Sequence, residues 1–581
     1  MNSQKKENIL NLALDTPESE RRKTDELDVG YDEDNNTWTL IVRYTGSLDE
    51  LQKYDAKYVE LIGGYGIIEV KEEFVDEVAA LEMIQYVEKP KNIFFEVVQG
   101  KRASCINPVQ TNPLNLSGKG IIVAVIDSGI DYTHPDFIDD NGNSRIISIW
   151  DQSVNTGAGV PPLGYNMGRE YNNEQINLAI KEENVINRNN IVPSMDYSGH
   201  GTAVASVAAG NGRDSDGRNA GVAYNSDLLI VKLATPGKDG FNRTSELMQA
   251  IDYCVKKSIE LNKPMALNLS FGNTYGSHSG TSLLETYIDD VANVGRSSIS
   301  VGSGNEGDSA GHTSGDIAGN SEIAVELAIA DFEASLSLQI WKAYSDEFEI
   351  ILESPSKEKK IVLGIPNAAY RTDFGNTRIL GYYGEPSPYS RYQEIYFEFV
   401  PLDDYIESGI WNIIIRSQKV VIGRYDMWLP SNAVINKGTT FLNPTVDTTL
   451  TIPSTAAKVI TVGAYNSRTN AMAPFSGRGY TRQTNQVKPD IVAPGVDIIC
   501  ASPGGGYTML SGTSIATPFV TGSAALLMEW GIIKGNDAYF YGEKLKENLI
   551  KGANPVGGLK DYPNPRAGFG ALCVRNSLPI L

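Results

Sequence analysis

Cysteine, histidine and long apolar runs are all scarce in this sequence. The 581 residues include four cysteines with no CxxC spacing, which excludes a disulfide scaffold. The composition favours reduced, unpaired thiols in a protein made in the cytoplasm. No run of about 18 or more apolar residues occurs, so we expect no membrane-spanning helix. The four histidines leave few candidates for a general base.

Positive charge is scarce relative to negative charge. The 50 Lys and Arg against 71 Asp and Glu give a net charge of −21. Such a surface repels phosphate backbones, and no local basic patch is visible, so we expect no nucleic-acid partner. The content of 41% apolar and 21% charged residues is that of a globular protein and excludes wholesale disorder.

The N-terminal segment does not have the pattern of a secretion signal. Its apolar stretch, Ile9–Leu14, is short, ends at Asp15 and is followed by charges rather than by a small-residue cleavage site. We therefore expect no signal peptide and synthesis in the cytoplasm. The segment is expected to form either a mobile leader or a short amphipathic helix.

Residues 1–99 have the pattern of a small separate domain. Short amphipathic helical patterns alternate with segments rich in β-branched and aromatic residues, in the order βαββαβ: Thr37–Tyr44, Ser47–Tyr54, Tyr58–Ile62, Gly66–Lys71, Glu73–Met83 and Gln85–Phe95. A split βαβ unit of this kind can fold by itself.

Residues 100–323 and 444–581 have the pattern of an α/β domain. Continuous apolar runs, typical of strands buried on both faces of a parallel sheet, occur at 121–127, 228–234, 265–272, 297–307 and 458–465. They alternate with helical patterns at His200–Gly210, Thr244–Leu261, Ser282–Asn293 and Ser514–Glu529. This order predicts a doubly wound, mostly parallel sheet. The connector Phe137–Met195 is polar without a clear period, and we expect it to be a surface excursion.

Residues 324–443 interrupt the α/β pattern. Short alternating strands such as LSLQIWKAY and EIYFEFV follow one another with Gly, Pro, Asn and Asp turns and without helical patterns. This pattern is typical of an all-β sandwich, here inserted into the α/β domain.

The motif SGTSIATP (511–518) is the strongest chemical signal. Its Ser514 stands at the start of a helix of small residues, where unpaired backbone N–H groups and the helix dipole favour a developing negative charge. Pro518 is expected near the first turn, where a missing N–H is tolerated. The alternative is a capped core helix, since serine is a common N-cap.

A serine nucleophile needs a base that is itself oriented by a third group. Of the four histidines, only His200 combines a helix start with glycine on both sides; a buried structural histidine is the alternative. Asp127 ends the apolar run IIVAVID, so it emerges at the carboxyl edge of the sheet, where α/β proteins bind ligands. Asn305 follows a buried strand in the turn SGNEG, and its amide could donate to an oxyanion together with the Ser514 N–H. By itself, such an Asn is usually only a turn residue.

Taken together, IDSGID, GHGTAVA, SGNEG and SGTSIATP, in the order Asp, His, Asn, Ser, resemble the subtilisin-like serine proteases (subtilases). The resemblance covers about half of the chain. It implies an endopeptidase in which Asp127 orients His200, His200 is general base and acid, Ser514 is the nucleophile and Asn305 completes the oxyanion hole.

The resemblance also implies substrate contacts. LSFG (269–272) is similar to the strand that pairs with substrate backbone, so Ser270 and Gly272 are expected to bind peptide. Val301, Gly302 and Ser303 are expected to form a wall of the pocket for the residue before the scissile bond.

The N-terminal unit is similar to the family's propeptide, a folding chaperone that stays as an inhibitor. Its last strand would lead NIFFEVVQG into the cleft, so self-cleavage is expected between Glu96 and Cys105. The first choice within that segment is the bond between Gln99 and Gly100.

The lack of a secretion signal, the prodomain and the all-β insertion together resemble a narrower group, the Csp germination proteases of spore-forming clostridia. This resemblance implies a jelly-roll insertion packed on the catalytic core, a prodomain that stays bound in the cleft, and activation of a cortex-lytic pro-enzyme in the spore. Two alternatives are a prodomain-blocked binding or sensing module and a general intracellular peptidase.

No cofactor is expected. FIDDNGN (137–143) and GRDSDGRNAG (212–221) carry oxygen ligands that could hold Ca²⁺, which many subtilases bind. Neither has the full twelve-residue loop with a closing Glu, so polar turns are the preferred interpretation and no metal ligand is assigned. Cys254 and Cys500 are expected to be buried core thiols.

Overall fold

The computed structural model describes residues 5–21, 23–33, 35–95, 103–155, 157–234, 242–364, 368–388, 390–482 and 486–579. The chain forms two compact units. The first contains Met1–Asn92, Asn273–Leu283 and Asp308–Ile452, and the second contains Ile93–Gly272, Leu284–Gly307 and Pro453–Leu581. Asp127, His200, Asn305 and Ser514 all belong to the second unit.

A nine-stranded sheet forms the centre of the second unit, in the order β27-β26-β14-β12-β7-β10-β8-β9, with β28 paired to β26. Its strands are β7 (Ile122–Asp127), β8 (Ile146–Asp151), β9 (Arg169–Asn172), β10 (Asp227–Lys232), β12 (Met265–Leu269), β14 (Ser297–Gly302), β26 (Ile460–Asn466), β27 (Ala471–Met472) and β28 (Ile491–Pro494). The central strand β7 is buried at every position and runs parallel to β10 and β12. This confirms the expected α/β class with a mostly parallel sheet.

Four helices of this domain form close to where the apolar patterns predict them: α8 (His200–Ala209), α9 (Thr244–Glu260), α10 (Leu283–Val291) and α11 (Thr513–Met528). The structure adds α12 (Gly542–Lys551) and the short α5 (Asn107–Gln110), which the sequence analysis does not predict. A two-stranded hairpin, β29 (Val496–Ala501) and β30 (Tyr507–Ser511), leads into α11. Helices α8, α11 and α12 share a hydrophobic cluster with Val123 and Val125 of β7. The small residues of α8 and α11 let these two helices pack closely against the sheet.

Among the described residues, one helical stretch, Thr513–Ile533, is long and apolar enough to cross a membrane by length and composition alone. Of its most apolar window, 94% is buried inside the protein. The stretch combines α11 with one further turn, so its apolar character is that of a core helix.

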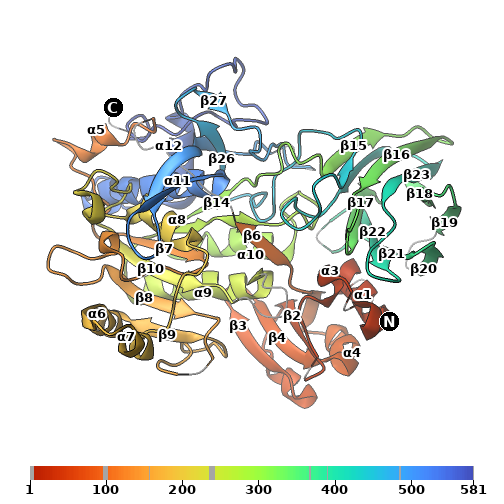
Figure 1. The fold of residues 1–581 in the computed structure, drawn as a ribbon, viewed down its shortest axis with the longest axis horizontal. Coiled ribbons are helices and arrows are strands. Elements are labelled where there is room, and N and C mark those ends of the chain that lie inside the picture. The colour runs from red at the N-terminus through yellow and green to blue at the C-terminus, as the bar shows by residue number, and fades with distance from the viewer. Residues whose placement is uncertain are drawn as a thin grey trace. The chain divides into compact units, whose positions relative to one another are not determined.

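The expectation that Phe137–Met195 is only a surface excursion is wrong. Residues Ile146–Asp151 form β8, which pairs in parallel with β10 inside the sheet, and β9 follows it as an antiparallel edge. Helices α6 (Asn173–Lys181) and α7 (Val185–Ile191) lie beside β8 and β9 (Figure 1). The strand was missed because its apolar run, IISIW, is short and contains a serine, and polar turns surround it.

The N-terminal part of the first unit is an antiparallel sheet with short helices. The sheet order is β1-β2-β4-β3, with β5 paired to β2. Its elements are α1 (Asn8–Asp15), α2 (Glu18–Arg21), α3 (Asp25–Asp28), β1 (Tyr31–Asp32), β2 (Thr37–Tyr44), a 3₁₀ helix (Asp49–Tyr54), β3 (Lys57–Leu61), β4 (Tyr65–Lys71), α4 (Val75–Ala80) and β5 (Ile84–Glu88). Of the two expectations for the first residues, the short helix is confirmed by α1, with Leu10 and Leu12 buried.

The last predicted strand of this part is divided in two. Strand β5 ends at Glu88, and a separate strand β6 (Asn92–Phe95) follows. Pro90 lies between them, and proline cannot donate a hydrogen bond to a strand ladder, so the pairing of β5 stops there. The stretch Ile93–Gly272, which begins inside β6, belongs to the second unit.

The remainder of the first unit is an all-β region of two antiparallel sheets. The six-stranded sheet has the order β15-β24-β17-β22-β21-β20, and the five-stranded sheet has the order β19-β18-β23-β16-β25. The strands are β15 (His312–Asp316), β16 (Glu322–Ile329), β17 (Leu336–Ala343), β18 (Glu347–Glu353), β19 (Lys359–Leu363), β20 (Ala368–Phe374), β21 (Thr377–Tyr383), β22 (Tyr392–Pro401), β23 (Gly409–Lys419), β24 (Arg424–Trp428) and β25 (Thr440–Phe441).

One hydrophobic cluster fills the space between these two sheets, with members such as Leu338 and Phe397 from one sheet and Leu352 and Ile413 from the other. The region is therefore a packed sandwich. Its jelly-roll connectivity and the domain boundaries at residues 99, 323 and 443 stay predictions.

The expectation of four unpaired cysteines is wrong for two of them. Cys105 and Cys573 form a disulfide with their Cα atoms 4.8 Å apart. Cysteine content and spacing could not reveal this bond, because its partners are 468 residues apart in the sequence. Cys254 and Cys500 are buried and free, as expected, and burial raises the pKa of Cys500 to about 12.

We expect this disulfide to stabilise the second unit. A cross-link over so long a loop typically contributes about 3–5 kcal/mol, because it restricts the unfolded chain. The Cys105→Ser/Cys573→Ser double variant should therefore unfold at lower urea concentration than the oxidised protein. Adding a reductant should lower the midpoint of the wild type and leave that of the double variant unchanged. A double variant with the wild-type midpoint would contradict the stabilising role.

Candidate functional site

Asp127 lies at the carboxyl end of β7 and is fully buried. Its Oδ1 atom is 2.7 Å from Nδ1 of His200 and also accepts the backbone N–H of Ser128 at 2.7 Å. A buried carboxylate needs such partners, since an uncompensated charge there would be costly. The contact fixes one ring nitrogen of His200 and directs the other, Nε2, away from Asp127.

His200 is the first residue of α8, and its two glycine neighbours explain its placement. Gly199 has a φ of +76°, a left-handed conformation that favours glycine. At Gly201, a Cβ atom would overlap the carbonyl oxygen of Gly129. The GHG sequence therefore lets the start of α8 approach the turn that follows Asp127.

Asp196 connects the turn after Asp127 with the start of α8 through hydrogen bonds. The sequence patterns did not single out this residue. Its carboxylate accepts hydrogen bonds from Ser128 Oγ at 2.7 Å, from the Gly199 N–H at 2.9 Å, and from the Thr202 N–H and Oγ1 at 2.8 and 2.7 Å. Ser128 Oγ in turn accepts the N–H of Gly201 at 2.9 Å. The available signal was its position four residues before His200, where an acidic side chain can satisfy the first N–H groups of a helix.

The other three histidines have structural surroundings. His134 accepts the N–H of Asp136 at its own short 3₁₀ turn, and its Nε2 lies 3.1 Å from the Gly506 carbonyl. His278 and His312 each stack on the Trp428 ring, with centroid distances of 4.2 and 4.6 Å. Of the four, His200 is the one whose ring contacts the buried carboxylate at the end of β7.

Ser514 is the second residue of α11 and is buried. The turn before it contains Gly512, and the helix dipole and first N–H groups point toward the serine. Pro518 lies inside α11 rather than in its first turn as expected. Because proline has no N–H, the Ser514 carbonyl lacks the usual i+4 donor.

Ser270 provides the missing donor. Its Oγ donates to the Ser514 carbonyl at 2.6 Å, and Asn268 Nδ2 donates to Ser270 Oγ at 2.7 Å. Thr521, further along α11, donates to Asn268 Oδ1 at 2.9 Å. This chain of hydrogen bonds fixes the position of the Ser514 backbone, so Ser270 contributes to the serine's geometry in addition to its predicted substrate contact.

Asn305 is oriented by the same turn. Its Oδ1 atom accepts the N–H of Thr513 at 3.2 Å, which makes the other end of the amide, Nδ2, the donating end. The structure therefore links Asn305 and Ser270 to the turn that carries Ser514, and links Asp127 to His200.

The predicted substrate-binding strand pairs with a strand of the chain itself. In a three-stranded sheet, β6 lies between β11 (Asn242–Arg243) and β13 (Phe271–Gly272). Gly272 pairs with Phe94, and Phe271 pairs with Phe95, in antiparallel register. Gln99 and Gly100 lie outside the described residues.

Gly302 and Ser303 lie at the carboxyl end of β14. A Cβ atom at Gly302 would stand 3.2 and 3.3 Å from the hydroxyls of Thr517 and Thr513, so glycine lets this strand approach α11. Ser303 is fully buried, and its N–H donates to the Val462 carbonyl at 2.9 Å. Their role as a wall of the substrate pocket stays a prediction.

The segment FIDDNGN forms a turn whose Ile138 carbonyl also accepts a hydrogen bond from Asn211 Nδ2 at 2.8 Å. Asp139 Oδ1 accepts the N–H groups of Asn141 and Asn143, each at 2.9 Å. In the other segment, Asp214 accepts the N–H of Gly506 at 2.6 Å. Within the described ranges, no group of three or more His, Cys, Asp or Glu side chains is arranged to hold a metal ion.

Two models of known protein families match the chain. The model of the subtilase family matches residues 118–333 and 433–570, and the model of the Csp protease B prodomain matches residues 4–91. The match to the subtilase model identifies the protein as a serine endopeptidase. The chain belongs to the subtilase family.

Among solved structures, the chain is similar to the CspB protease of Clostridium perfringens, with 38% identity, a TM-score of 0.75, and coverage of 82% of this chain and 96% of that chain. It is also similar to two proteases of Bacillus subtilis (strain 168). Minor extracellular protease Vpr is 23% identical over 80% of this chain and 52% of Vpr, and serine protease AprX is 35% identical over 22% of this chain and 32% of AprX. The matches thus span about half of Vpr and a third of AprX.

Proposed function

We propose that this serine endopeptidase cuts its own polypeptide after the prodomain and then cuts a protein substrate by limited proteolysis. The observation that carries the proposal is the buried Asp127–His200 pair, at 2.7 Å, in a subtilase chain whose Ser514 begins α11. Membership in the subtilase family and the similarity to CspB protease support the same activity.

In the proposed mechanism, the Ser514 hydroxyl oxygen attacks a peptide carbonyl carbon while His200 Nε2 takes the hydroxyl proton. Asp127 holds the ring so that Nδ1 carries a proton and Nε2 is free to accept one. The oxyanion forms between Asn305 Nδ2 and the Ser514 N–H. His200 then donates its proton to the leaving amine, and water hydrolyses the acyl-enzyme.

The position of β6 supports self-cleavage. A strand that adds to β13 and β11 is held by backbone hydrogen bonds, which is how an extended peptide binds a sheet edge. The chain continues from Phe95 toward Gln99 and Gly100, so the bond between them stays our proposed cleavage site. The prodomain is then the first occupant of the cleft.

The proposed substrate is a pro-enzyme of a cortex-lytic hydrolase, and the proposed location is the spore. This finer proposal is supported by the Csp protease B prodomain match and by the 38% identity to CspB protease. Two alternative functions remain open: a binding or sensing module that is blocked by its prodomain, and a general intracellular peptidase.

Hydrolysis of an added peptide distinguishes the proposal from the blocked module. A synthetic peptide of residues 92–106 should be cut at one bond by the wild type and left intact by Ser514→Ala. Self-cleavage without turnover of added peptide or denatured protein would favour the blocked module. Cleavage of many unrelated proteins at many sites would favour the general peptidase.

Asn305→Ala should slow the reaction without preventing folding. In subtilisin, loss of the corresponding amide donor lowers kcat by about 10²–10³. We expect a decrease of that order in kcat for peptide hydrolysis, with KM nearly unchanged. Asn187→Ala, an exposed amide on α7, is the control and should keep the wild-type kcat. Equal kcat in Asn305→Ala and wild type would remove Asn305 from the oxyanion hole.

A further inference from the structure

The outer face of the six-stranded sheet is covered by the N-terminal part of the same chain. Along β21, Ile379 and Tyr383 point into the sandwich, whereas Leu380 and Tyr382 point outward. Leu380 and Tyr382, with Tyr396 and Val400 of β22, form a continuous cluster with residues of α1 and of the N-terminal sheet. These four residues are at most 5% exposed, so the surface they form is closed.

Polar contacts fix the position of residues 5–91 on this surface. Glu20 is paired with Arg378, at 2.6 Å, and with Arg371. Lys23 Nζ donates to the Pro401 carbonyl at 3.0 Å. The outer face therefore has charged and polar anchors in addition to its apolar centre.

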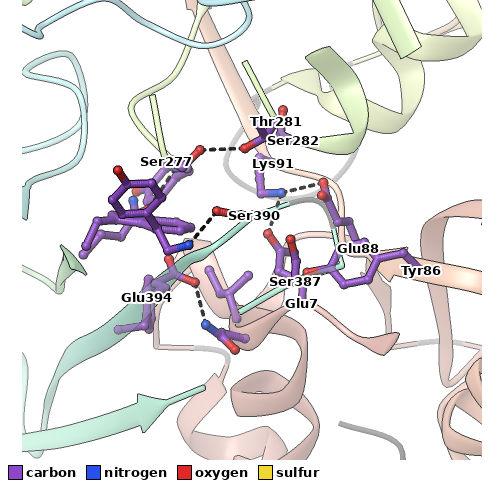
Figure 2. A pocket seen from close by; sticks show the side chains of 18 of the residues that line it. Glu7, Tyr86, Glu88, Lys91, Ser277, Thr281, Ser282, Ser387, Ser390 and Glu394 are labelled. Carbon is purple, nitrogen blue, oxygen red and sulfur yellow. Dashed lines mark hydrogen bonds and ion pairs between the residues drawn. The ribbon is translucent and has the colours of Figure 1, made fainter. Parts of the chain in front are cut away.

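A cavity at the edge of this surface holds a cluster of carboxyl groups (Figure 2). Asn8 Nδ2 donates to Glu394 Oε2 at 3.1 Å. Lys91 lies 2.6 Å from Glu7 and 3.1 Å from Glu88. The titratable groups that line the cavity with Glu394 are Glu7, Glu88, Glu385, Lys91 and four tyrosines, Tyr86, Tyr275, Tyr392 and Tyr396.

The charges of this cluster do not balance. Glu7, Glu88, Glu385 and Glu394 surround the single cation Lys91 among the described lining residues. Burial, with the nearby charge of Glu7, raises the pKa of Glu394 from 4.5 to about 8. Burial opposes the charge of Lys91, but Glu7 and Glu88 raise its pKa above the ordinary value, so Lys91 stays charged. Burial also raises the pKa of Glu7, but Lys91, 2.6 Å away, opposes that rise, so we take Glu394 as the carboxyl group that keeps its proton in the docked form.

We propose that the outer face of the six-stranded sheet is the docking surface that, through residues 5–91, retains the whole prodomain as a separate fragment after self-cleavage between Gln99 and Gly100, and that this docking is tightest while Glu394 holds a proton. The inference rests on the proposed self-cleavage. The fragment is then held at two places: at β13, through β6, and at the outer face formed by β21 and β22.

The direction of the pH effect follows from proton linkage. The docked form holds a proton on Glu394 that the released form loses above its ordinary pKa of 4.5. Docking therefore weakens as pH rises from about 4.5 to about 8, by up to tenfold per pH unit, and then levels off. A rise in pH through the neutral range would favour release of the fragment and opening of the cleft.

Two variants separate the carboxyl group from the surface itself. Glu394→Gln keeps the shape of the protonated acid, so it should remove most of the pH dependence. At Gly384, a Cβ atom would overlap the Asn8 side chain, and its three nearest neighbours all belong to Asn8. Gly384→Val should therefore displace Asn8 from Glu394 while leaving the sandwich intact. Glu326→Gln, an exposed carboxyl on β16, is the matched control.

The test is the rate at which the cleaved fragment leaves the purified protein after dilution, measured by size exclusion and mass spectrometry at pH 5.5 and 8.5. We expect wild type and Glu326→Gln to release it at least tenfold faster at pH 8.5. Glu394→Gln should release it slowly at both pH values, and Gly384→Val quickly at both. Equal rates for the wild type at the two pH values, or an unchanged pH dependence in Glu394→Gln, would overturn the proposal.

A second measurement keeps this inference separate from self-cleavage. In the uncut Ser514→Ala chain, amide hydrogen exchange of residues 8–15 reports docking of α1 directly, after correction for the intrinsic effect of pH. Protection there should decrease from pH 5.5 to 8.5 and should not decrease in the Ser514→Ala/Glu394→Gln double variant. An uncut wild type with this pH-dependent protection would contradict self-cleavage and support docking. Self-cleavage of the wild type together with pH-independent protection of residues 8–15 would support self-cleavage and contradict pH-dependent docking.

Discussion

Ser514→Ala should abolish peptide hydrolysis and leave the chain uncut. The variant keeps the helix start, the Ser270 contact with the residue-514 carbonyl and the Asn305 contact with Thr513, because these involve backbone atoms. It removes only the nucleophilic oxygen. In subtilisin, loss of the nucleophile lowers kcat by about 10⁶, and we expect a loss of at least ~10⁴ here.

The matched control is Ser511→Ala, an exposed serine just before the same helix. It should hydrolyse the peptide of residues 92–106 at the wild-type rate and cut its own chain normally. Initial rates followed by chromatography of the products measure both variants. Residual hydrolysis by Ser514→Ala within tenfold of the wild type would assign the nucleophile to another residue.

Asp127→Asn should have the next largest effect, although the variant is nearly the same size. Asp127 Oδ1 accepts the Nδ1 proton of His200 and the N–H of Ser128. An asparagine amide that donates to Nδ1 would favour the wrong ring tautomer, so that Nε2 would carry the proton and could not act as a base. For a triad of this kind the loss in kcat is about 10⁴.

The measurement is kcat and KM for peptide hydrolysis, together with the urea midpoint. We expect a large loss in kcat, a small change in KM and a modest change in stability. Asp131→Asn serves as the control, because Asp131 lies in the turn after β7 and contacts Thr133 rather than His200. A kcat for Asp127→Asn within tenfold of the wild type would show that His200 is not oriented by Asp127.

The candidate catalytic side chains could be predicted because each follows a strong local pattern. Asp127 ends a continuous apolar run, and His200 and Ser514 start helices of small residues, so a place at the carboxyl edge of the sheet follows from the pattern. The glycines beside His200 are visible in the sequence, but the reason for Gly201 is a long-range contact, because a Cβ atom there would overlap the carbonyl oxygen of Gly129.

Long-range contacts could not be predicted in the same way. The Cys105–Cys573 bond joins residues that share no local pattern, and the short apolar segment of β8 is hard to distinguish from a loop. Asp196 looks like any polar residue in a turn until the fold brings its hydrogen-bond donors together. The role of Ser270 depends on Pro518, which lies in a different part of the chain.

Intact mass and N-terminal sequencing of purified wild type beside Ser514→Ala show whether Ser514 cleaves the chain that carries it. We expect two fragments in the wild type, with a new N-terminus between Glu96 and Cys105 and Gly100 as the first choice. We expect one uncut chain of 63.2 kDa in the variant. An uncut wild type, or the same cut in Ser514→Ala, would contradict the claim that Ser514 cleaves its own chain.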